Sequence, residues 1–352
     1  MTDCSRNLKQ NGKLGKQVKD QAIAHLPITA AITPITAAGK LRENIQERIY
    51  LGLQERKMLY EPADAIQFGS SEAYYLSFLE GAPGAQLLWH RDAKPYRHIV
   101  SINIRKYVLA MQNFGKELKP CPLCCATLFS LLGCMLDNSL DSGTAEERER
   151  ALQILDWERG CGCYFTGVKA GGNGLEDAML TEIGMFLQSI RFASSKKYEC
   201  LLVQIRRAVY AEFCSVSEIN INKGCQYALD KSVLFTFLGF CLAASGNLSR
   251  REIQLCRMVG QVFGLFDDLC DLEEDQALGQ LNSILCQACS ATELLHCIDQ
   301  AFLTLDRLLN TLSRYFSPEF YNFLLYELRI WTLCNHYIAD RSRNQVDLTA
   351  LT

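Results

Sequence analysis

The sequence predicts an all-α protein made of one large helical domain. Apolar residues recur with a helical period from about residue 40 onward, strand-like alternation is rare, and helix-start signals precede several apolar segments. No Pro-, Gly- or Ser-rich linker divides the 352 residues, so we expect a single domain over residues 39–345. Residues 1–38 lack this pattern and begin with dispersed basic residues, so we expect them to be disordered or loosely attached.

Start signals place the boundaries of several predicted helices. Thr144 and Ser249 each precede a glutamate by three positions, which is the spacing of a capping box. Ser317 followed by Pro318 supplies an N-cap and a first-turn proline. The tetrapeptide SINI at residues 101–104 is the best candidate for a strand. The predicted helices span residues 123–141, 144–158, 176–193, 196–215, 226–244, 249–275, 291–315 and 318–339.

Composition argues against several classes of protein. A formal net charge of -3 gives no sign of the basic face that nucleic-acid binding needs. The odd count of 17 cysteines, many inside apolar runs, argues against a disulfide framework and favours a reducing, cytoplasmic compartment. No apolar run reaches about 18 uncharged residues, so we expect no transmembrane helix. The basic N-terminal tail is compatible with peripheral contact with a membrane of anionic lipid.

An acidic stripe lies at the end of the predicted helix 249–275. Its members are Asp267, Asp271, Glu274 and Asp275, with Asp268 beside them. Anions at a helix C-terminus oppose the helix macrodipole, and like charges one turn apart repel each other. A chain selected only for stability would place Lys or Arg there, so the stripe indicates a site that needs a cation. A solvated helix end is the alternative for one such cluster taken alone.

A second apolar helix ends in the same way, because Asp137 and Asp141 lie one turn apart on one face, with Asn138 beside them. Two such ends side by side would form a carboxylate-lined mouth over an apolar interior, which suits a diphosphate with a long hydrocarbon tail. Oxygen ligands of this kind suit Mg²⁺, which also binds phosphate oxygens. The predicted metal ligands are Asp137, Asn138, Asp141, Asp267, Asp268, Asp271, Glu274 and Asp275, with catalytic roles for Asp137, Asp267 and Asp271.

Both acidic motifs resemble those of the class I isoprenoid synthases, the all-α fold of trans-prenyl diphosphate synthases and terpene cyclases. FDDLCDLEED followed by QLN is similar to the second motif of the large-terpene synthase family, which includes the tetraprenyl-β-curcumene synthases. CMLDNSLD is similar to the first motif, and the resemblance covers roughly residues 125 to 345. The chain departs from the family pattern at Cys134, where the first motif begins with Asp, and at Asp268, where the family has Tyr.

This resemblance implies a helical bundle around a central apolar cavity and a Mg²⁺-dependent terpene synthase or cyclase, which is a carbon–oxygen lyase. Such an enzyme ionises a linear polyprenyl diphosphate, here a long-chain one, and releases a cyclic or linear terpene with diphosphate. Lys231, Arg341 and Arg343 are expected to supply positive charge for the diphosphate. The candidate aromatic residues of the cavity are Phe235, Phe237, Phe263, Phe266, Trp331 and Tyr337.

Two alternative functions stay open. A prenyltransferase would join the allylic cation to isopentenyl diphosphate or another small nucleophile, but GKLRE at residues 39–43 matches the basic segment of such enzymes only weakly. A non-catalytic helical lipid-binding protein would keep the fold without the metal chemistry, and Cys134 is the feature in its favour. A zinc site at CPLCC and CGC is disfavoured, because the second pair has the wrong internal spacing.

Overall fold

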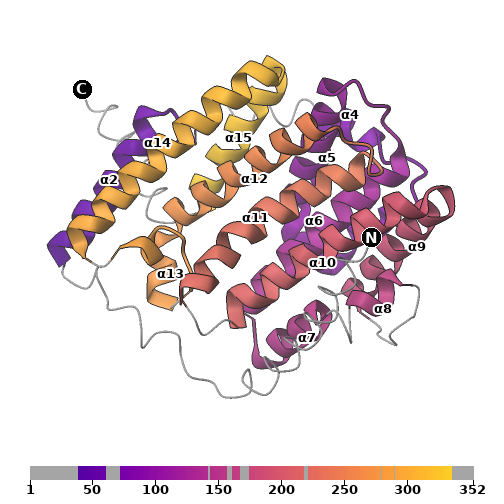
Figure 1. The fold of residues 1–352 in the computed structure, drawn as a ribbon, viewed down its shortest axis with the longest axis horizontal. Helices are drawn as coiled ribbons and strands as arrows, with labels where there is room; N and C mark the ends of the chain where they lie inside the picture. Colours follow the sequence, from indigo (N-terminus) through magenta and orange to yellow (C-terminus); the bar gives the residue numbers. More distant parts are fainter. Residues whose placement is uncertain are drawn as a thin grey trace, which may run out of the picture.

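The computed structural model of the protein describes residues 39–60, 72–141, 143–156, 161–166, 174–217, 221–278, 280–288 and 290–334. Every regular element within these ranges is a helix (Figure 1), so the prediction of an all-α fold is confirmed for the described residues. The N-terminal segment 1–38 and the predicted site residues Tyr337, Arg341 and Arg343 lie outside the described ranges.

The long helices form where the capping signals and the apolar period predict them. Thr144 and Ser249 each close a capping box with the glutamate three residues later. The predicted end at residue 158 is wrong for the helix after Thr144, which ends at Leu155. The helices that correspond to predictions are α6 (Pro120–Asp141), α7 (Ala145–Leu155), α9 (Leu175–Ala193), α10 (Ser195–Ser217), α11 (Ile221–Ala243), α12 (Arg250–Cys270), α14 (Ala291–Tyr315) and α15 (Pro318–Cys334).

The strand candidate at residues 101–104 is wrong, because SINI lies inside helix α5 (Arg97–Asn113). All residues from Val100 to Met111 are buried. Apolar and polar side chains therefore both face the interior, and the alternation of apolar and polar residues in SINI does not indicate a strand. The other elements not individually predicted are α2 (Gly39–Glu55), α4 (Glu72–Ser77), α8 (Cys161–Phe165), α13 (Leu272–Leu278) and the 3₁₀ helices η2 (Ala85–Trp89), η3 (Arg91–Tyr96) and η4 (Leu285–Gln287).

Helix α11 lies in the middle of the bundle. It runs beside α10 and α12 (Figure 1) and also packs against α5 and α6. The far side of α12 is covered by α14 and α15, and the far side of α6 by α9. This arrangement brings the C-terminal ends of α6 and α12, which carry the two acidic motifs, against the same central helix.

Two glycines allow α11 and α12 to approach closely. A Cβ atom added at Gly260 would lie 2.8 Å from the Cα of Val233, and one added at Gly264 would lie 2.8 Å from the Cβ of Ser232. Both distances are shorter than real Cβ contacts, so larger residues at these positions would force the helices apart. The close approach holds Lys231, the neighbour of Ser232, beside the acidic end of α12.

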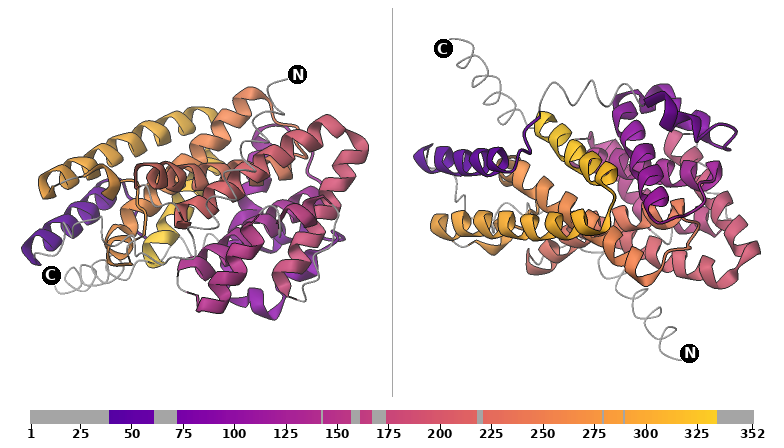
Figure 2. Two further views of the ribbon diagram at one scale, coloured as in Figure 1. Left: turned by 60° about the horizontal axis from the view of Figure 1, so that its bottom comes forward. Right: turned by 90° about the horizontal axis from the view of Figure 1, so that it is seen from above.

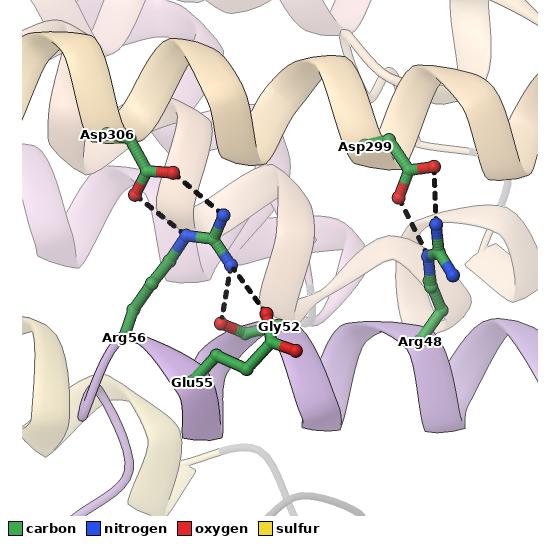
Figure 3. A network of polar contacts seen from close by, with 6 residues as sticks. All are labelled: Arg48, Gly52, Glu55, Arg56, Asp299 and Asp306. Carbon is green, nitrogen blue, oxygen red and sulfur yellow. Dashed lines mark hydrogen bonds and ion pairs between the residues drawn. The ribbon is translucent and has the colours of Figure 1, made fainter.

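Helices α2 and α14 are far apart in the sequence but lie side by side at one end of the molecule (Figures 1 and 2). One arginine of α2 and the arginine that directly follows this helix form paired hydrogen bonds with aspartates of α14 (Figure 3). Arg48 binds Asp299, and Arg56 binds Asp306 while also donating to the carbonyl of Gly52. These contacts tie the first described helix to the C-terminal part of the bundle.

Among the described helices, α6 is the one long and apolar enough to cross a membrane, with a mean hydropathy of 1.5 over its best window. Because 67% of that window is buried inside the protein, α6 packs as the core helix of a helical bundle does. The cysteines of α6 are free, whereas Cys286 is disulfide-bonded.

Candidate functional site

The two acidic helix ends meet in the folded protein. Burial raises the pKa of Asp267 well above its usual range, and the charges of Asp271, Asp268 and Asp137 raise it further. Burial and the charge of Asp137 raise the pKa of Asp141 to about 6, with a further contribution from Asp271. Since Asp137 and Asp141 end α6 while Asp267 and Asp271 end α12, each motif lies within electrostatic reach of the other.

Lys231 of α11 lies between the acidic groups. Its Nζ is 2.8 Å from Oδ1 of Asp137 and 3.6 Å from Oε1 of Glu212 on α10. Burial would lower the pKa of Lys231, but Asp137 and Glu212 outweigh this effect and hold the pKa well above its usual value. Lys231, predicted as a diphosphate ligand, is therefore a charged partner of the acidic cluster in this structure.

Glu212 is a member of the site that the sequence analysis missed. It is buried, and burial raises its pKa to about 7, with Asp137 and Asp141 adding to the effect and Lys231 opposing it. The residue stands alone in the C-terminal part of α10, with no acidic neighbour one turn away to mark it. Only the packing of α10 against α11 brings it to Lys231.

The acidic stripe of α12 continues past the end of the helix. The predicted single helix 249–275 is divided at Asp271, whose backbone φ of -97° and ψ of 8° depart from helical values. The N–H of Asp271 still donates to the carbonyl of Asp267 at 2.9 Å, and that of Asp275 to the carbonyl of Asp271 at 2.8 Å. The three aspartates therefore stay on one stripe, and α13 follows α12 directly.

Two residues after α13 bind the outer carboxylates of this stripe. Ser283 donates from its N–H, at 3.3 Å, and from its hydroxyl to Oδ2 of Asp268. Asn282, which the resemblance includes in the second motif, donates to Oδ2 of Asp275 at 2.8 Å. Burial nevertheless raises the pKa of Asp268 to about 6 and that of Asp275 to about 8. Both carboxylates thus have neutral protein donors, whereas the donor to Asp137 is the charged Lys231.

The remaining predicted ligands lie at the rim of the site. Asn138 is exposed and donates through Nδ2 to the hydroxyl of Tyr96, 3.1 Å away at the end of η3. Glu274 is exposed as well. Its neighbour Glu273 accepts a hydrogen bond from Gln46 of α2. The structure therefore places Asp137, Asp141, Asp267 and Asp271 within electrostatic reach of one another. Asp141, Asn138 and Glu274 are exposed to solvent.

Three of the predicted aromatic residues gather behind the acidic ends. The ring of Trp331 on α15 lies 5.4 Å from that of Phe263 and 6.4 Å from that of Phe266, both on α12. Phe235 instead stacks on Phe129 of α6 at 5.2 Å. The predicted aromatic set therefore divides into separate groups.

Phe237 belongs to neither aromatic group, since its ring lies 5.0 Å from the guanidinium of Arg257. It follows Phe235 by two positions on α11, and two helical positions differ by about 200° in direction. Phe235 and Phe237 therefore cannot face the same space, although both were predicted to line one cavity.

The donor set of the acidic cluster fits Mg²⁺. Its carboxylates are hard oxygen ligands, and the like charges around Asp267 are relieved when a divalent cation binds. Within the described ranges, no three Asp, Glu, His or Cys side chains are arranged to hold a metal ion without rearrangement. Mg²⁺ sites that process phosphates commonly use one or two carboxylates together with waters and phosphate oxygens, so a complete protein cage is not required.

No protein-family model and no curated protein matches the chain. The site itself is therefore the guide to function: it joins two acidic helix ends, a partly buried lysine and an aromatic group.

Proposed function

We propose that the protein is a Mg²⁺-dependent class I terpene synthase that ionises a linear, long-chain polyprenyl diphosphate and releases a cyclic or linear terpene plus diphosphate. One observation carries the proposal: the acidic ends of α6 and α12 converge on Lys231, whose Nζ lies 2.8 Å from Oδ1 of Asp137, and their carboxyl groups are within electrostatic reach of each other. Ionised carboxylates crowded in this way destabilise the protein unless protons or a cation neutralise them, and the cluster adjoins an aromatic, apolar interior.

Each part of the site has a role in this reaction. Asp137, Asp267 and Asp271 would hold Mg²⁺, which when bound supplies Lewis-acid stabilisation of the leaving diphosphate. Lys231 adds a positive charge at the same place, which favours an anion there. The rings of Phe263 and Trp331 present apolar faces that exclude water and stabilise a carbocation by up to about 2 kcal/mol each.

Purified protein should be incubated with Mg²⁺ and with farnesyl, geranylgeranyl or geranylfarnesyl diphosphate, while released diphosphate and hydrocarbon are measured. We expect Asp267→Asn to lower Mg²⁺-dependent diphosphate release by on the order of 100-fold, because it removes a metal-binding charge. The matched control is Glu149→Gln, which makes the same charge change on exposed α7 and should retain activity.

Three outcomes would contradict the proposal. Wild-type protein that turns over none of these diphosphates in Mg²⁺ is not a terpene synthase of this class. Product that forms only when isopentenyl diphosphate is added identifies a prenyltransferase instead. Equal activity of wild type and Asp267→Asn places the chemistry away from the acidic cluster.

A further inference from the structure

A buried ion pair joins α5 and α15. Nζ of Lys106 lies 2.9 Å from Oε1 of Glu327, and the two residues are only 7% and 3% exposed. Removing both charges from water is more costly than burying apolar residues of the same volume, so such a pair is a poor device for stability. Neither residue belongs to the acidic motifs.

The second oxygen of Glu327 has no such partner. Oε2 is buried and makes no hydrogen bond within the part of the chain that the structure describes. Buried carboxylate oxygens in folded proteins nearly always accept hydrogen bonds, because leaving one unpaired is costly. Lys106 neutralises one side of the carboxylate, and no described residue donates to the lone pairs of Oε2.

The pair lies among the aromatic residues behind the acidic ends. Nζ of Lys106 is 4.8 Å from the centre of the Phe263 ring, which itself lies 5.4 Å from the ring of Trp331. Trp331 follows Glu327 by one helical turn on the same face of α15. The free carboxylate oxygen and the aromatic group therefore border the same apolar interior.

The pair also lies close to the acidic motifs. Burial and the charge of Asp137 raise the pKa of Cys134 to about 12, while Lys106 lowers it and Asp267 and Glu327 raise it. Cys134 of α6 thus lies within electrostatic reach both of the ion pair and of the proposed metal ligands. Cys134 therefore connects the surroundings of Glu327 with those of the acidic ends, where the proposed function places the diphosphate.

We propose that Glu327 is the catalytic residue that accepts the proton from the carbocation and so ends the reaction, and that Lys106 is the positioning residue that holds it. The inference rests on the proposed terpene synthase function. A C–H bond beside the cationic carbon breaks, its electron pair forms the new C=C bond, and the proton moves to Oε2 of Glu327. The proton then passes to water after the product leaves, and no oxidant or reductant is needed.

The test compares diphosphate release with product identity, using the same three polyprenyl diphosphates and Mg²⁺. We expect Glu327→Gln to release diphosphate at a rate near that of wild type, because ionisation precedes proton removal. Its ratio of alcohol, formed when water captures the cation, to olefin should rise at least about tenfold, as expected when a general base is lost. Glu319→Gln makes the same charge change elsewhere on α15 and should leave the ratio unchanged.

A second variant separates this role from folding. Glu327→Gln leaves Lys106 buried without a counter-charge, so the double variant Lys106→Met/Glu327→Met removes both charges and keeps the volume apolar. It should fold and show the same shift from olefin to alcohol. Wild-type product ratios in both folded variants overturn the role of Glu327 and leave the terpene synthase proposal intact. Loss of diphosphate release in the folded double variant assigns the pair to ionisation and also overturns the role. A wild type that releases no diphosphate overturns both proposals.

Discussion

Lys231 determines the charge balance of the acidic site. It is the cation that contacts both Asp137 and Glu212, and its side chain is only 25% exposed. A lysine in this position stabilises ionised carboxylates that would otherwise be protonated or separated. Its contribution to stability therefore depends on whether the neighbouring acids carry their charge.

We expect Lys231→Met to lower the free energy of unfolding by about 1–3 kcal/mol at pH 8. The loss should be smaller at pH 5, because Glu212, whose pKa is about 7, is then neutral and needs no cation. Urea unfolding at the two pH values measures the difference. Lys119→Met is the matched control, since Lys119 is 60% exposed and pairs with exposed Glu117. Equal losses for the two variants would contradict this account of Lys231.

The two arginine–aspartate pairs between α2 and α14 differ in their surroundings although their chemistry is the same (Figure 3). Arg48 is 54% exposed, whereas Arg56 is 19% exposed and its guanidinium lies 4.5 Å from the centre of the Phe302 ring. Arg56 also donates to the carbonyl of Gly52, at the point where α2 approaches Phe302 most closely. The position of α2 on the bundle thus depends mainly on the second pair.

We expect Arg56→Ala to lower the free energy of unfolding by about 1.5–3 kcal/mol, since it removes charge-assisted hydrogen bonds and a stacked ring contact. Arg48→Ala should cost less than about 1 kcal/mol, as is typical of exposed ion pairs. Chemical denaturation of the two variants side by side provides the comparison, with each arginine serving as control for the other. A larger loss from Arg48→Ala would mean that burial does not set the strength of these pairs.

The whole molecule should respond to pH through its crowded carboxyl groups. Asp141 and Asp268 have pKa values of about 6, Glu212 of about 7 and Asp275 of about 8, in each case chiefly because of burial. A carboxyl group whose pKa is raised on folding favours the folded state while it is protonated. Its contribution is complete below the unfolded pKa of about 4 and is lost as pH rises through the folded value.

We therefore expect the metal-free protein to lose stability steadily from about pH 4 to about pH 8, where most soluble proteins are near their maximum. Mg²⁺ should stabilise the protein more at pH 8 than at pH 5, because the ion competes with protons for the same oxygens. Thermal unfolding over this pH range, with Mg²⁺ or with a chelator, measures both effects. A pH-independent effect of Mg²⁺ would show that the ion does not bind the carboxylates with raised pKa values.

Local signals were sufficient to predict most of the helices. Thr144 and Ser249 form capping boxes with residues three positions away, so these helix starts depend on the adjacent sequence alone. The acidic stripe of α12 was predictable for the same reason, because the helical period places Asp267 and Asp271 one turn apart. Helix α5 was not predicted as a helix, because its residues from Val100 to Met111 are all buried. Without an exposed polar face, the sequence shows no helical period there.

Which charged residues pair inside the bundle could not be found in this way. Lys106 and Glu327 are 221 residues apart, and Lys231 and Asp137 are 94 residues apart. A single buried lysine or glutamate carries no periodic or spacing signal, since its partner comes from another helix. The amino-acid sequence is enough to predict the helices and their acidic ends, because hydrogen bonds and periodicity within a helix are local. Which charges meet inside the bundle depends on how the helices pack, because only close packing brings distant residues within reach of one another.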